Sequence, residues 1–278
     1  MRTHIPETGW VPVVANGVTH AVFDEGEGPL VLLIHGFPDT AHTWDEVAPA
    51  LVAEGFRVVR PFGRGIAPSE IPSGNAFHVR DLAADVVALI EALGEETAIV
   101  VGHDWGAAAV WGAGHIAPER ISKLVVVGIP YPPAVRPTLS KLWGARHFLA
   151  NKLPWATRRF RKNDFAEVRR MYERWSPGFA WPDSEFESAK NAYAHPGCAS
   201  AAIGYYRRLG LWPFKGKVSC NAFVIGGQSD GVVSAADFER SARFVDGNCR
   251  VEMLPGGHFL HREHPQPFID TLLDCLRD

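Results

Sequence analysis

The sequence has few cysteines, no long hydrophobic run and almost no excess of charge of either sign. The four cysteines (Cys198, Cys220, Cys249 and Cys275) show no metal-ligand spacing and no CxxC pair, which predicts free thiols, a reducing compartment and no metal. No apolar run approaches membrane-spanning length, and the first ten residues lack the apolar region of a signal peptide. A net charge of −3 gives no electrostatic reason to expect nucleic acid or an anionic membrane as a partner. These absences predict a cytoplasmic protein without a membrane span.

What is present describes an ordinary globular chain of 278 residues, of which 46% are hydrophobic and 21% charged. A chain of this length forms one large or two small domains and buries a core without disulfide support. It contains no internal repeat and no low-complexity tract, and it does not indicate an oligomeric state. The fold must therefore be sought in the order of strands and helices.

Short apolar runs alternate with helical patterns at both ends of the chain. The expected strands are Val11–Ala15, Thr19–Phe23, Leu30–Ile34, Phe56–Pro61, Ala98–Val101, Lys123–Val127, Ala222–Gly226 and Val251–Leu254. The expected helices include Trp44–Glu54, His78–Leu93, Ala235–Phe244 and Pro267–Leu276. Residues 131–213 differ, because they show several short helical patterns and hold five of the nine tryptophans.

This alternation predicts an α/β fold whose largely parallel sheet is covered by helices on both faces. We expect one core domain, formed by residues 1–130 and 214–278. Residues 131–213 are expected to form a helical cap that is inserted between two strands of the same sheet.

The most informative stretch is Gly102-His103-Asp104-Trp105-Gly106, between an expected strand and an expected helix. Small residues two positions before and after Asp104 have the spacing of a nucleophile elbow, a tight turn that admits nothing larger there. The turn places the central side chain above the sheet, near a helix N-terminus that favours an anion. Serine is the usual occupant, and aspartate favours attack on a saturated carbon over cleavage of an ester. The alternative is an aspartate that only caps the helix.

A second aspartate and a histidine follow in the chain order nucleophile, acid, histidine. His258 lies in a Gly-Gly-His context after the last expected strand and is the candidate general base. Asp230 follows the strand Ala222–Gly226 and would orient the imidazole and stabilise its cation. The competing residues are His261, His264, Asp237 and Asp246.

The loop His35-Gly36-Phe37-Pro38 follows the strand Leu30–Ile34. We expect an oxyanion hole formed by the backbone N–H groups of Phe37 and Trp105, the residue after the nucleophile. The side chains of Phe37, Pro38 and Trp105 are expected to bind the substrate. The alternative for this loop is a simple tight turn.

In four motifs and their order, the chain resembles the α/β-hydrolase fold family, and specifically its epoxide hydrolase branch. The motifs are His35-Gly36-Phe37-Pro38, Gly102-His103-Asp104-Trp105-Gly106, Gly227-Gln228-Ser229-Asp230 and Gly256-Gly257-His258. The resemblance covers nearly the whole chain and implies a mostly parallel eight-stranded sheet with an inserted helical cap, and neither cofactor nor metal. It also implies conversion of an epoxide to a vicinal diol through an alkyl ester on Asp104, hydrolysed by water that His258 activates. The Phe37–Pro38 bond, often cis in the family, is expected to be cis.

An epoxide opens to an alkoxide, which needs a proton donor near neutral pH. The segment Ala202–Arg208 resembles the family's cap segment, in which a tyrosine immediately precedes an arginine, and this implies that Tyr206 is the ring-opening acid. Tyr205 lies about 100° away on a helix and would face elsewhere. His147 is expected to be a second donor, because some relatives carry histidine in this region; the alternative is a core histidine.

A haloalkane or fluoroacetate-type dehalogenase is the alternative enzyme, since haloalkane enzymes share the Asp104-Trp105 pair. Against it, Phe37 stands where many of those enzymes have a polar halide-binding residue, and Tyr206 has no role in their chemistry. Fluoroacetate enzymes carry arginines beside the nucleophile, where this chain has Trp105 and Ala108. A non-catalytic hydrolase-fold binding protein would require a broken triad. We therefore expect a hydrolase whose partner is a small apolar or aromatic epoxide.

Overall fold

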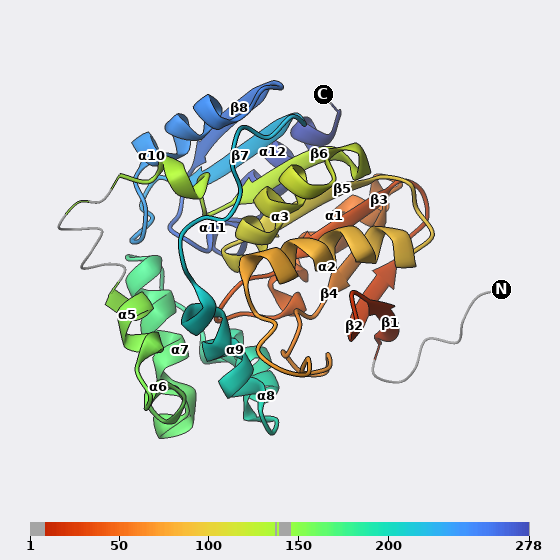
Figure 1. Cartoon of the computed structure of the whole chain (residues 1–278). Coiled ribbons are helices and arrows are strands. Elements are labelled where there is room, and N and C mark those ends of the chain that lie inside the picture. Colours follow the sequence, from red (N-terminus) through yellow and green to blue (C-terminus); the bar gives the residue numbers. More distant parts are fainter. Residues whose placement is uncertain (1–8, 137, 139–145, 278) are drawn as a thin grey trace.

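The centre of the molecule is a sheet of eight strands in the order β1-β2-β4-β3-β5-β6-β7-β8, seen in a computed structural model that describes residues 9–136, 138 and 146–277 (Figure 1). The strands are β1 (Val11–Ala15), β2 (Val18–Glu25), β3 (Leu30–Ile34), β4 (Arg57–Pro61), β5 (Ala98–His103), β6 (Ile121–Val127), β7 (Ala222–Gly227) and β8 (Cys249–Leu254). Among them, β1 with β2 and β2 with β4 pair antiparallel, and the other pairs are parallel. The predicted α/β fold with a mostly parallel sheet is therefore confirmed.

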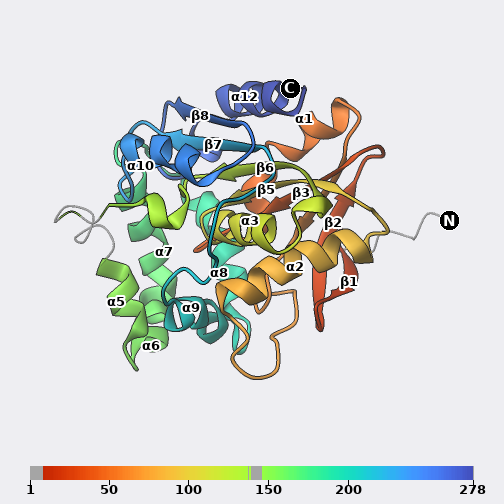
Figure 2. The same cartoon turned by 45° about the horizontal axis from the view of Figure 1, so that its top comes forward.

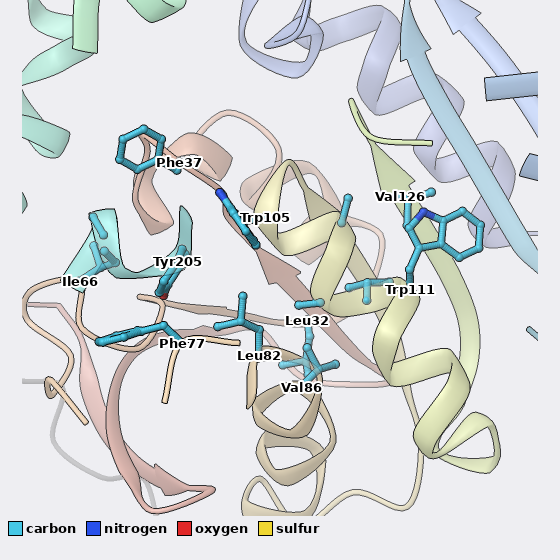
Figure 3. Close-up of a cluster of buried hydrophobic side chains, with 14 of the residues drawn as sticks. Leu32, Phe37, Ile66, Phe77, Leu82, Val86, Trp105, Trp111, Val126 and Tyr205 are labelled. Atoms are coloured by element: carbon cyan, nitrogen blue, oxygen red, sulfur yellow. The ribbon is translucent and has the colours of Figure 1, made fainter. Parts of the chain in front are cut away.

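Helices cover both faces of the sheet, because successive residues of a buried strand point to opposite sides. On one face, Leu32 and Val100 pack with α2 (Val79–Ala92) and α3 (Trp105–Ile116), as Figure 3 shows for part of this cluster. On the other face, the neighbouring residues of β3 and β5 pack with α1 (Ala48–Ala53) and α12 (Pro265–Arg277). In Figure 2, α12 lies on the side of the sheet opposite to α2 and α3.

Two expected helices are shorter than the pattern predicted, and the one expected over residues 235–244 is α-helical only over Ala235–Arg240, with a 3₁₀ turn over Ser241–Phe244. Residues 44–54 were expected to be helical throughout, but the structure has a short 3₁₀ turn, Ala41–Trp44, followed by α1. Pro49 lies in the first turn of α1, where its missing N–H costs nothing, but it cannot donate to the carbonyl of Asp45 as a helix continuing from residue 44 would require. The proline therefore separates the two pieces.

The described residues between β6 and β7 form helices and no strand. The α-helices are α5 (Arg146–Lys152), α6 (Ala156–Phe160), α7 (Lys162–Trp175), α8 (Glu187–Ala194) and α9 (Cys198–Arg208). Figures 1 and 2 show them gathered beside the sheet, whereas α10 (Ala235–Arg240) and α11 (Leu260–Glu263) follow β7 and β8. None of the helices in the described part of the chain is long and apolar enough to cross a bilayer.

Candidate active site

Asp104 occupies the turn between β5 and α3 with a positive φ of 51° and a ψ of −116°, a backbone conformation that is unusual for a residue with a side chain. Its carboxylate makes no hydrogen bond to the first turn of α3, so the structure does not support a helix-capping role. A Cβ on Gly102 would lie 2.3 Å from the carbonyl oxygen of Gly106, and one on Gly106 would lie 2.2 Å from that of Ile34. Side chains at these positions would push the turn apart, which explains the small residues on both sides of the aspartate.

His258 lies between two carboxylates, which come from the ends of other strands. Its Nδ1–H donates to Oδ2 of Asp230 over 2.9 Å, and its Nε2 faces Oδ2 of Asp104 at 3.4 Å. The other Asp230 oxygen accepts the backbone N–H groups of Val232 at 2.6 Å and Val233 at 3.2 Å. Asp230 is thus held from both sides, and it fixes the imidazole with Nε2 toward Asp104.

The competing residues are engaged elsewhere. His261 is buried against Trp44, and its Nε2 lies 2.7 Å from the hydroxyl of Thr43. Asp237 forms the capping box of α10, and Asp246 pairs with Lys217 on the surface. His264 packs its ring 6.2 Å from that of Phe179. Among the described residues, the Asp104 carboxylate is hydrogen-bonded to Phe37 and His258 and to none of these four.

The loop after β3 points a backbone N–H at the other oxygen of Asp104. The Phe37 N–H donates to Asp104 Oδ1 over 2.8 Å, and the Phe37–Pro38 bond is cis. Beside it, the ring of His35 accepts the Gly63 N–H and donates to the Gly36 carbonyl, each over 2.8 Å. Trp105 opens α3, so its backbone N–H has no partner within the helix. Of the predicted pair of N–H donors, that of Phe37 contacts the Asp104 carboxylate, and that of Trp105 directly follows Asp104 in the chain.

The charges in this site favour an ion pair. Burial by itself lowers the pKa of His258. This effect is outweighed by the charge of Asp230, by the hydrogen bonds to both carboxylates and by the charge of Asp104, so the pKa is raised to about 10. Burial raises the pKa of Asp104, but the hydrogen bond and charge of His258 outweigh it, so the pKa is lowered. Burial and the charge of His258 lower the pKa of the neighbouring His103 to about 3, so this ring is neutral and donates to the His258 carbonyl. His258 therefore carries a proton while Asp104 is ionised.

Replacing Asp104 by asparagine should lower the pKa of His258, because it removes one of the two negative charges that stabilise the imidazolium. An opposite charge at this range is typically worth about one to three pH units, so the titration midpoint should fall by that amount. NMR titration of the His258 ring would measure it, with Asp246→Asn, on the surface, as the control. A midpoint that is the same in Asp104→Asn and the wild type would mean that Asp230 alone holds the proton.

Tyr206 faces the Asp104 turn, and Tyr205 faces away from it. The Tyr206 ring lies 5.1 Å from the ring of Phe37 and 5.3 Å from that of Trp105, edge to face with both. Burial and then the charge of Asp104 raise the pKa of Tyr206 well above its usual value, so the hydroxyl keeps its proton. The Tyr205 hydroxyl instead donates to the carbonyl of Arg64 over 2.7 Å. The expected divergence of the two tyrosines is present.

His147 lies in the same aromatic shell. Its ring is buried, 5.7 Å from Tyr206 and 4.8 Å from Trp175. Trp175 in turn lies 5.4 Å from the ring of His258. His147 is therefore next to Tyr206 on the side of the site formed by α5 and α7.

The end of α7 holds the loops that carry both triad partners, a feature that the sequence analysis missed. The Trp175 carbonyl accepts the N–H groups of His258 and Gly231, each over 3.0 Å. A Cβ on Gly231 would lie 2.3 Å from the carbonyl oxygen of Arg174. The Asp-Gly context of Asp230 was the one sequence signal of this contact, because only glycine leaves room for the α7 backbone.

Ser176 makes a second connection to the histidine loop. Its hydroxyl donates to the Glu263 carboxylate and accepts the Phe259 N–H over 3.1 Å. The same carboxylate accepts the Gly257 N–H over 3.0 Å, and a Cβ on Gly257 would lie 2.4 Å from the Ser176 Cα. The segment after α7 therefore packs directly on the backbone that positions His258.

A cavity of about 240 Å³ opens beside Asp104. Most of its wall is apolar, with Trp105, Ile129 and Phe148 among the lining residues. Three residues were expected to bind substrate. Trp105 lines this cavity, whereas Phe37 and Pro38 are buried and do not line it. Tyr206 and His147 lie behind the wall, against Trp105 and Phe148.

Comparisons with known proteins agree with this architecture. A family model described as "alpha/beta hydrolase fold" matches residues 29–265. The AB hydrolase superfamily protein YfhM of Bacillus subtilis is 28% identical over 96% of this chain and 97% of its own length. Epoxide hydrolase A of Mycobacterium tuberculosis is 29% identical over 95% of this chain and 96% of its own. The crystal structure of epoxide hydrolase A from Mycobacterium thermoresistibile superimposes with a TM-score of 0.84 at 26% identity, covering 96% of this chain and 98% of that one. The chain belongs to the alpha/beta hydrolase fold family and groups there with epoxide hydrolases.

Proposed function

We propose that this protein is an epoxide hydrolase that forms a vicinal diol through an alkyl ester on Asp104. The observation that carries the proposal is the ionised carboxylate at the elbow, with Oδ1 on the Phe37 N–H and Oδ2 facing His258. Curated relatives that match nearly the whole chain are named epoxide hydrolases, which supports the same activity.

In the first step, Asp104 Oδ2 attacks a ring carbon of the epoxide, and the carbon–oxygen bond of the ring breaks. The electron pair goes to the ring oxygen, which takes a proton from the Tyr206 hydroxyl. Because the pKa of Tyr206 lies well above its usual value, this group is protonated before the reaction. His147, beside the Tyr206 ring, is proposed as a second donor to the same oxygen.

In the second step, water hydrolyses the ester. Alkylation removes the negative charge of Asp104, so His258 loses part of what holds its proton and releases that proton to become the neutral base. The Tyr206 phenolate left by the first step takes up a proton in turn, which restores the tyrosine. His258 then takes a proton from a water molecule that attacks the Asp104 carboxyl carbon. The charge that develops on Oδ1 is stabilised by the N–H groups of Phe37 and Trp105. Collapse of this intermediate releases the diol and leaves one oxygen of water in Asp104.

Residues 131–213 are proposed to act as a cap over a core of residues 1–130 and 214–278. Phe148 of α5 and the segment after α9 supply part of the cavity wall, and Tyr206 and His147 lie on α9 and α5. A wall with so few polar groups suits a small apolar or aromatic epoxide.

Parallel assays of diol release from styrene oxide and halide release from a bromoalkane test the activity. We expect diol release to be the faster reaction, because the protonated Tyr206 beside Trp105 can give its proton to an epoxide oxygen, whereas a leaving halide needs no proton. Halide release that exceeds diol formation would instead favour a dehalogenase. Neither product, from a folded protein, would favour a non-catalytic binding protein.

Replacing Tyr206 by phenylalanine should slow alkylation of Asp104 by epoxides about 10²–10⁴-fold, the usual effect of losing one positioned acid. His147 should make the loss smaller, and hydrolysis of the preformed ester should be nearly unchanged. Stopped-flow tryptophan fluorescence would follow the first step, since Trp105 touches both the tyrosine ring and Asp104. Tyr205→Phe is the matched control, because its hydroxyl is bonded to Arg64. Equal alkylation rates in the wild type and Tyr206→Phe would contradict the assignment.

A further inference from the structure

The mouth of the cavity carries a positive charge that the proposed chemistry does not use. The described lining contains two fully charged side chains, Asp104 and Arg208, the last residue of α9. Leu211 lines the same cavity and is 94% exposed, so the segment with Arg208 and Leu211 marks the opening to solvent. Within the described residues, the Arg208 guanidinium makes no hydrogen bond and no ion pair. Its donors are therefore available to a ligand.

A second donor lies in the same lining. Nδ1 of His78 accepts the Arg80 N–H over 3.2 Å as the cap of α2, so the proton of the neutral ring is on Nε2. Arg80 lies close by, bonded to the Pro213 carbonyl over 2.7 Å. The nearby acidic group, Asp81, accepts the His78 backbone N–H over 2.8 Å. The mouth therefore combines a guanidinium with an imidazole N–H, in surroundings with more positive than negative charge.

We propose that Arg208, with His78, binds a carboxylate of the substrate, so that the preferred substrates are epoxides with an anionic group at the end remote from the ring. This inference rests on the proposed function. A guanidinium pairs with a carboxylate through two parallel hydrogen bonds, and at the mouth both groups keep part of their hydration. Asp104 repels the carboxylate from the inner end, so the epoxide enters first. Between Arg208 and Asp104, the apolar part of the cavity wall, which includes Ile129 and Phe148, contacts the body of the substrate.

The test compares two substrates of nearly the same shape, the 4-carboxylate and the 4-carboxamide of phenyl glycidyl ether. For the wild type, we expect kcat/KM for the carboxylate to exceed that for the carboxamide about tenfold. The neutral amide cannot form the ion pair with Arg208, and this pair is partly exposed to solvent. In Arg208→Gln the ratio should fall to about one, chiefly through KM. Arg208→Glu should instead favour the 4-aminomethyl analogue over the carboxylate.

Arg207→Gln is the matched control, since Arg207 is adjacent in sequence but donates to the Pro154 carbonyl and is not in the lining of this cavity. It should keep the wild-type ratio. If the carboxamide is hydrolysed and the wild type shows no preference for the carboxylate, the inference is overturned while the proposed function stands. The same holds if Arg207→Gln changes the ratio as much as Arg208→Gln does. If neither substrate is opened, the proposed function is overturned, and the inference with it.

Discussion

Replacing Asp104 by alanine should reduce epoxide hydrolysis to below detection, a loss of the order of 10⁵–10⁶-fold, as is typical when a covalent nucleophile is removed. No other carboxylate in the described site faces the cavity beside the Phe37 N–H, so no neighbour can replace it. Because Asp104 has a positive φ, Asp104→Asn is the better tolerated companion variant. Circular dichroism of both variants would show whether the fold is retained. Turnover by a folded Asp104→Ala protein at near the wild-type rate would rule the nucleophile out.

The same mechanism predicts where the oxygen of water first goes. In a single turnover in heavy-oxygen water, the label should enter the carboxyl group of Asp104, since water attacks the carboxyl carbon of the ester. The first diol released should then carry the unlabelled oxygen that came from Asp104. Mass spectrometry of the peptide with Asp104 and of the diol would measure both. Label found in the first diol and not in the protein would indicate direct hydration of the epoxide.

Replacing His258 by glutamine should trap the protein as the alkyl ester. The imidazole is needed to activate water but not to form the ester, so Asp104 should still be alkylated while ester hydrolysis falls about 10²–10⁴-fold or more. Intact-mass spectrometry after addition of styrene oxide should show the mass of protein plus epoxide. In the wild type, the adduct should turn over too quickly to accumulate.

His261→Gln is the control for this experiment. His261 is buried three residues further on and is bonded to Thr43, so its loss should affect stability and not ester hydrolysis. No adduct should therefore accumulate in this variant. Adduct in His261→Gln, or its absence from His258→Gln although substrate binds, would mean that the base has been assigned wrongly.

Much of this protein could be predicted from local sequence pattern. The strands and helices of the sheet follow from apolar runs and helical spacing, and β5 and α2 lie within a few residues of their expected bounds. The elbow is only partly local, because Gly102 is required by Gly106 in the same turn, whereas Gly106 is required by the Ile34 carbonyl at the end of the neighbouring strand β3. Aspartate at the centre of that turn was enough to indicate a carboxylate nucleophile.

The contacts that complete the site depend on the tertiary structure. Asp104 and His258 are 154 positions apart, and no periodicity in the sequence distinguishes His258 from the equally buried His261. The role of the Trp175 carbonyl could not be predicted, because every residue has a carbonyl and only packing decides which loop it meets. The free guanidinium of Arg208 beside the bonded Arg207 is a similar case. Sequence therefore determined which groups and elements are present, whereas packing between distant segments decided which of them face one another, since side-chain direction across such distances is set by the assembled core.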